Sequence, residues 1–140
     1  MPPGAAGGTP AVVIDTNRVL DLWLFDDPQV DALRDAIARG GARWLAQPAM
    51  REELARVLGY PAVLAQLARR QRTADSVLAA FDRWSHPVPA ADPAPVRCRD
   101  PDDQIFIDLA VAWRARLFSK DLAVLALARR LAPLGVTVER

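Results

Sequence analysis

Cysteine and histidine are nearly absent from this sequence: each occurs once in 140 residues, as Cys98 and His86. A lone cysteine excludes an intrachain disulfide and fits a reducing compartment, so we expect a cytoplasmic protein. A zinc site built from histidine and cysteine is effectively excluded, and so are catalytic triads with a strong histidine base, unless His86 serves. Any metal chemistry in this chain must therefore rest on carboxylates.

The sequence also lacks long apolar runs and a large net charge. No hydrophobic segment approaches the roughly 18 residues of a membrane span, and the opening MPPGAAGGTP has neither the basic region nor the apolar stretch of a signal peptide. We expect no membrane association, a flexible tail over residues 1–10 and a single domain over residues 11–140. The net charge of +1 leaves a nucleic-acid partner open, because the distribution of charge decides such binding.

Short apolar runs and longer helical patterns alternate along the chain. The apolar runs predict strands at residues 11–14, 42–46, 115–119 and 135–139, with a shorter one near residue 88. Capping residues, prolines and glycines delimit predicted helices at residues 17–25, 28–39, 48–58, 62–84, 101–113 and 121–130, with Asn17 as the N-cap of the first. This alternation predicts a three-layer α/β/α fold with a central, mostly parallel sheet.

Two predicted strands end in an aspartate, in VVID (Asp15) and LFSKD (Asp121). Ligands of open α/β folds bind beyond the carboxyl ends of the strands, which is where both carboxylates are expected. Aspartate is also a common helix cap, so either residue alone has a purely structural explanation. The recurrence of the pattern favours a functional site.

Two predicted helices carry further acids. In RDPDDQIFIDLAVAW, Asp100 fits the N-cap, and Asp103 lies at the edge of the apolar face, although the pattern does not separate it securely from Asp102. Acids in a first helical turn are favoured by the helix dipole alone. Asp108 points away from the apolar face and is expected to be solvated.

In QPAMREELARVL, Glu53 flanks the apolar stripe and Glu52 lies on the opposite side. Four carboxylates are therefore expected to converge: Asp15, Glu53, Asp103 and Asp121. Packed carboxylates repel one another unless a cation neutralises them, and ligands that are all oxygen suit Mg²⁺ or Mn²⁺. Ions held in this way most often act on phosphates.

The segments VVIDTNRVL, EELARVL, CRDPDDQIFIDLA and LFSKDLAVL resemble, in order, the four motifs of the PIN-domain family. The resemblance extends from Ala11 to Val138 and is strongest to the bacterial branch of toxins from toxin–antitoxin pairs, the VapC-like ribonucleases. It implies an α/β/α fold whose acidic quartet binds Mg²⁺ or Mn²⁺ and cleaves single-stranded RNA. On this chain the quartet falls on Asp15, Glu53, Asp103 and Asp121.

The resemblance also implies supporting residues and partners. Asn17 and Ser119 match polar positions near the metal and phosphate, while Lys120 replaces the usual glycine and can contact a phosphate or point into water. An antitoxin protein and a homodimer are implied partners, and residues 23–37 are a candidate dimer surface. The arginines of ARRQR (Arg69, Arg70 and Arg72) are weak candidates for RNA binding, with an ordinary solvated helix face as the simpler explanation.

Two other classes of protein remain open at this point. A phosphotransferase of the haloacid-dehalogenase type also places an aspartate after its first strand, but it needs a second aspartate at the position that Asn17 occupies. A module that keeps the acidic quartet and binds RNA or protein without cleaving is the other alternative. A nuclease assay distinguishes this second class from an enzyme.

Overall fold

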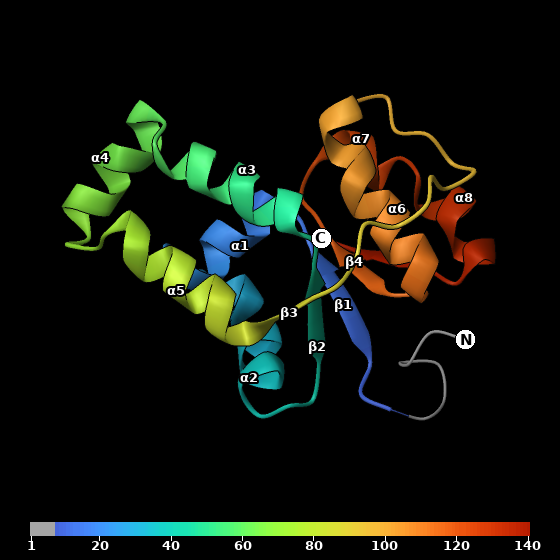
Figure 1. The fold of residues 1–140 in the computed structure, drawn as a ribbon, viewed down its shortest axis with the longest axis horizontal. Coiled ribbons are helices and arrows are strands. Elements are labelled where there is room, and N and C mark those ends of the chain that lie inside the picture. The colour runs from blue at the N-terminus through green and yellow to red at the C-terminus, as the bar shows by residue number, and fades with distance from the viewer. Residues whose placement is uncertain (1–7) are drawn as a thin grey trace.

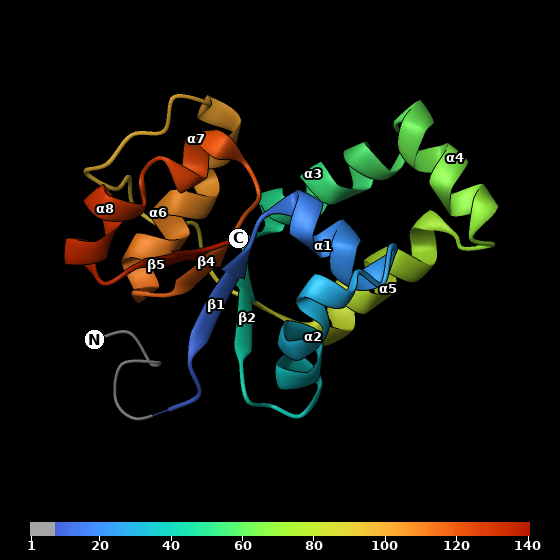
Figure 2. The same ribbon diagram turned by 180° about the vertical axis from the view of Figure 1, so that it is seen from behind.

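A five-stranded sheet forms the middle of the molecule. The computed structural model describes residues 8–140 (Figures 1 and 2). The strands lie in the order β3-β2-β1-β4-β5, and every neighbouring pair is parallel. Their bounds are β1 Ala11–Ile14, β2 Arg43–Ala46, β3 Ser85–Pro87, β4 Arg116–Phe118 and β5 Thr137–Glu139. The central strand β1 is buried throughout, which explains its uninterrupted AVVI sequence.

Helices cover both faces of the sheet. Figures 1 and 2 show α1 to α5 on one face and α6 to α8 on the other. Their bounds are α1 Thr16–Trp23, α2 Asp31–Ala38, α3 Pro48–Leu58, α4 Pro61–Arg69, α5 Ala74–Trp84, α6 Gln104–Trp113, α7 Leu122–Leu125 and α8 Ala128–Leu131. Short 3₁₀ turns are η2 Pro28–Val30, η3 Pro101–Asp103 and η4 Ala132–Leu134. The predicted three-layer α/β/α fold is confirmed.

The predicted helix over residues 62–84 is wrong in its continuity. The chain forms α4 and α5 separately, and Gln71 between them adopts a left-handed backbone conformation with φ 55°. Thr73 then caps α5, because its side chain accepts a hydrogen bond from the Ser76 amide at 3.1 Å. No glycine or proline marks this break, so the sequence pattern missed it.

The predicted last helix, over residues 121–130, is likewise two short helices, α7 and α8. The Leu127 amide bonds to the Val124 carbonyl at 3.0 Å, three residues back, which tightens the chain between them. The first helix begins one residue earlier than predicted, at Thr16, and its N-cap is Asp15 rather than Asn17. The predicted cap was wrong because the backbone of Asp15 is extended and its carbonyl accepts the first helical bonds.

Tryptophans join the α1 to α5 layer to the sheet. Trp23 stacks on Trp44 and on Trp84, with ring centroids 6.4 Å and 6.3 Å apart. Phe81 meets Trp44 edge-on at 5.0 Å, and Trp44 is almost fully buried. Trp44 and Phe81 belong to the core, and Trp23 and Trp84 pack against it.

Most of the predicted N-terminal tail, residues 1–10, lies outside the described residues. Its last residue, Pro10, accepts a hydrogen bond from the Arg43 amide at 2.8 Å, just before β1 pairs with β2. Among residues 8–140, no helix is both long enough and apolar enough to cross a membrane.

Candidate functional site

Parallel pairing of β1 and β4 brings the first and last acids of the chain together. Asp15 follows β1 directly, and Asp121 lies three residues beyond β4. Ser119 links them: its Oγ donates to Asp15 Oδ2 at 2.7 Å and accepts from the Asp121 amide at 3.1 Å. Ser119 is fully buried, so this link is fixed within the core. The two carboxylates thus occupy the carboxyl edge of the sheet, as expected.

Glu53 reaches the same edge from α3. Its Oε2 accepts a hydrogen bond from Thr16 Oγ1 at 2.7 Å, and Thr16 is the residue after Asp15. Glu53 is half-buried and Glu52 is exposed, as the helical projection predicted. Thr16 was not predicted as a site residue, although a hydroxyl residue directly after the aspartate was the available signal.

Asp103 is the acid of η3 that faces the site. One oxygen each from Asp100, Asp103 and Asp121 can be chosen so that all three lie within 4.8 Å of one another. Asp103 is buried and its Oδ2 has no hydrogen-bond partner among the described residues, whereas Asp102 is exposed. Asp100 was expected only as a helix cap. It does cap, since its side chain accepts from the Asp102 amide at 3.0 Å, but it also belongs to the acidic group.

The acids raise one another's affinity for protons. Burial, followed by repulsion from Asp15, Asp121 and Asp100, raises the pKa of Asp103 to about 7. Burial also raises the pKa of Asp15, although the Ser119 hydroxyl opposes this shift by stabilising the ionised form. Glu53 and Asp121 add smaller repulsions to Asp15. The carboxyl edge of the sheet therefore carries more negative charge than the surrounding residues neutralise.

This group of acids fits a divalent cation. Its donors are all oxygen, its members repel one another, and the buried Asp103 Oδ2 lacks a partner. Asp100, Asp103 and Asp121 would hold the ion. Asp15 and Glu53, which the sequence also predicted as ligands, lie at the same edge but outside this group of three, so their part as ligands stays a prediction. Hard oxygen ligands of this kind suit Mg²⁺ or Mn²⁺ rather than zinc.

The raised pKa of Asp103 predicts that the stability of the ion-free protein falls as the pH rises. From about pH 4 to pH 7 the unfolded chain ionises this carboxyl while the folded chain keeps its proton, so folding takes up a proton across this window. We expect Asp103→Asn to melt at a higher temperature than the parent at pH 8 in EDTA, with the difference shrinking towards pH 5. Mg²⁺ should raise the parent's melting temperature more at pH 8 than at pH 5. A difference between the two proteins that does not change with pH would contradict this prediction.

Lys120 pairs with an acid on α1, a partner that the sequence did not indicate. Its Nζ lies 2.7 Å from Asp21 Oδ2, and the same oxygen accepts from Arg18 Nη1 at 3.0 Å. Arg18 and Asp21 are buried, whereas Lys120 is only partly exposed. Lys120 therefore links the chain between Ser119 and Asp121 to α1, and its contact with a phosphate stays a prediction.

The ARRQR arginines lie away from the acids. Arg72 donates to the Trp23 carbonyl at 2.9 Å and to Asp26 Oδ2 at 2.6 Å, while the Arg70 guanidinium lies 5.1 Å from the centre of the Phe25 ring. Figures 1 and 2 both show this turn between α4 and α5 at the end of the molecule farthest from the sheet. Arg69 is exposed. Arg70 and Arg72 thus connect the turn between α4 and α5 to the end of α1 by hydrogen bonds.

Asp108 is not solvated as predicted. Its Oδ1 accepts from the Ala94 amide at 2.9 Å and from Gln104 Nε2 at 2.8 Å. Gln104 also donates to the Val96 carbonyl at 2.9 Å and accepts from the Cys98 amide at 2.6 Å. The proline-rich connection thus forms hydrogen bonds to Asp108 and Gln104 of α6. These bonds explain why that face of the helix carries polar residues.

The comparisons with known proteins agree with this geometry. A search of curated proteins found no match to the chain. The sequence profile described as PIN domain matches residues 11–118, which include Asp15, Glu53 and Asp103 and stop just short of Ser119 and Asp121. Members of this family are generally nucleases, and they typically use divalent metals. Because the match spans most of the sequence and the sheet carries the acids at its carboxyl edge, the chain belongs to the PIN domain family.

Proposed function

We propose that this protein is an endoribonuclease of the cytoplasm that hydrolyses phosphodiester bonds of single-stranded RNA with Mg²⁺ or Mn²⁺. One observation carries the proposal: the buried, unpartnered oxygen of Asp103 lies within an acidic group at the carboxyl edge of the sheet. If these acids only capped helices, no buried oxygen would be left without a partner. The unpartnered oxygen therefore favours a cation site.

Each residue of the site has a distinct part in this mechanism. Asp100, Asp103 and Asp121 would hold the ion, which would activate a water molecule and stabilise the negative charge of the phosphate. Ser119 orients Asp15, and Thr16 orients Glu53, so both carboxylates keep fixed positions beside the place where the ion would be held. Asn17, exposed at the start of α1, is a polar contact for the RNA backbone.

The resemblance of the motifs to VapC-like ribonucleases supports a finer proposal, that the protein is the toxin of a type II toxin–antitoxin pair and forms a homodimer. The predicted dimer surface over residues 23–37 needs correction, because Val30, Leu33 and Ile37 pack into the core of a single chain. Among residues 8–140, the large exposed apolar side chains are Tyr60 and Leu64, on and beside α4, and Leu122 at the start of α7. Light scattering of the purified protein tests the dimer.

Cleavage of a labelled pool of single-stranded RNA tests the nuclease. The protein is incubated with Mg²⁺, Mn²⁺ or EDTA, beside Asp15→Asn and the matched control Asp35→Asn, whose parent residue is exposed on α2. We expect cleavage that needs the ion, is lost in Asp15→Asn and persists in Asp35→Asn. A folded protein that binds the pool without cutting it under any of these conditions would instead favour the alternative, an inactive module that binds RNA.

A further inference from the structure

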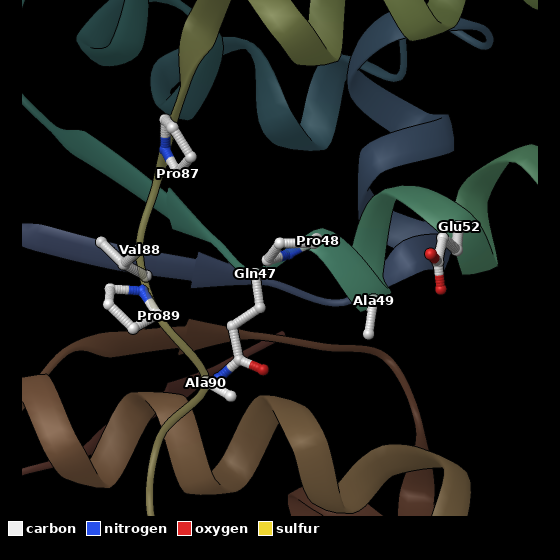
Figure 3. Close-up of a pocket in the computed structure, with 8 residues that line it drawn as sticks. All are labelled: Gln47, Pro48, Ala49, Glu52, Pro87, Val88, Pro89 and Ala90. Atoms are coloured by element: carbon white, nitrogen blue, oxygen red, sulfur yellow. The ribbon is translucent and has the colours of Figure 1, made fainter.

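A second feature of interest lies on the carboxyl edge of the sheet, outside the group of acids. A pocket of about 610 Å³, open to solvent, sits at the carboxyl ends of β2 and β3 (Figure 3). Its walls come from the start of α3 and from the chain just after β3. The lining includes Gln47, Pro48, Glu52, Pro87, Val88 and Pro89. None of these residues has a part in the acidic site described above.

Gln47 marks the pocket as a binding site. The residue is only 5% exposed, yet Figure 3 shows its side chain directed away from α3 and towards Ala90, into the pocket. Gln47 is the N-cap residue of α3, and its carboxamide is not one of the buried groups that lack a partner among residues 8–140. A carboxamide offers two donor hydrogens and an acceptor oxygen. Because this one is directed into an open pocket, a ligand bound there can replace water as its hydrogen-bond partner.

The chemistry of the walls selects the kind of ligand. Among the described residues that line the pocket, none carries a positive charge, and Glu52 is negative. A phosphate or an acidic peptide is therefore disfavoured. The three proline rings and Val88 form apolar walls for a flat ring, while Gln47 and Glu52 offer hydrogen bonds to its polar edge. An unpaired nucleobase combines these properties.

The position of the pocket fits a base next to the phosphate that is cut. Strand β2 lies beside β1, which ends at Asp15, and neighbouring strands are roughly 5 Å apart. The pocket, at β2 and β3, is thus one or two strand spacings from Asp15 and two or three from Asp121, a distance that one or two nucleotides span. We propose that this pocket binds the base that flanks the scissile phosphate and gives the enzyme its sequence preference. The role in cleavage rests on the proposed nuclease function, but base binding can be tested without it.

Nuclear magnetic resonance titration tests base binding independently of cleavage. Uncharged ribonucleosides, each of the four in turn, are added to ¹⁵N-labelled protein, with ribose 5-phosphate as the probe for a phosphate site. We expect at least one nucleoside to shift the Gln47 side-chain amide and the backbone amides of Val88 and Ala90. Gln47→Leu should weaken this binding about tenfold, while Gln29→Leu, at an exposed glutamine, should not change it. Because Gln47→Leu alters a buried residue, the exposed variant Glu52→Gln is measured beside it and should also weaken binding.

The outcomes separate the two proposals. Shifts from ribose 5-phosphate that equal those from the nucleosides, or no shifts from any nucleoside at the pocket, overturn the base subsite whether or not the protein cuts RNA. Sequencing of the ends of the cleaved RNA then tests whether the pocket sets the base preference beside the cut. If the protein cuts and the base preference beside the cut is unchanged in both Gln47→Leu and Glu52→Gln, the subsite is overturned while the nuclease stands. Loss of that preference in both variants supports it.

Discussion

Asp103→Asn is expected to lower the rate of RNA cleavage by at least about 100-fold, because removal of one carboxylate from an ion site costs several kcal/mol of transition-state stabilisation. The neighbouring variant Asp102→Asn should retain the parent rate, since Asp102 is exposed and has no part in the acidic group. Single-turnover cleavage of one RNA substrate, with excess enzyme and saturating Mg²⁺, measures both.

Calorimetric titration with Mg²⁺ and Mn²⁺ provides the control for this pair. Asp103→Asn should lose most of the heat of binding, and Asp102→Asn should keep it. The assignment of the ion site to Asp103 fails if the two variants lose cleavage and ion binding equally. It also fails if Asp102→Asn alone loses them, which would point to a different arrangement of η3 in solution.

Asp21→Ala is expected to destabilise the protein by about 3 to 5 kcal/mol, the largest loss of stability that we predict. Asp21 Oδ2 is the acceptor for both Arg18 and Lys120, and the Arg18 side chain is only 1% exposed. Without Asp21, the Arg18 guanidinium stays buried with only a distant carboxylate, Asp27, at 3.9 Å. Urea unfolding followed by circular dichroism measures the free energy of unfolding.

Lys120→Ala is the matched control for Asp21→Ala. It removes the other cation of the same cluster, but that side chain is 38% exposed and water can replace it. The expected loss of stability is at most about 1 kcal/mol. Equal losses in the two variants would show that the burial of Arg18 contributes little, and the prediction for Asp21 would then be wrong.

Much of the site was predictable because it follows local rules. A β-branched run that ends in aspartate predicts a strand with an acid at its carboxyl end, and this held for Asp15. Parallel strands then bring distant acids to one edge, so the approach of Asp121 followed from the alternation of strands and helices. Helical projection was enough to separate Glu53 from Glu52.

Other features depend on contacts that no local pattern contains. Asp100 was assigned one role, as a cap, and only the packing of η3 against the chain after β4 brings it beside Asp121. Lys120 forms an ion pair with Asp21, which lies in a distant part of the sequence. The breaks at Gln71 and near Leu127 lack the usual glycine or proline, so a pattern based on those residues ran both helices together.

The bond between Ser119 and Asp15 joins residues 104 positions apart in the chain. At the usual rate of synthesis, roughly 5 to 20 seconds pass between the addition of the two residues. During that time the nascent chain carries Asp15 without Ser119 or Asp121 beside it, because β4 has not yet paired with β1. A ribosome that stalls before β4 therefore leaves a product in which the acidic site is not assembled.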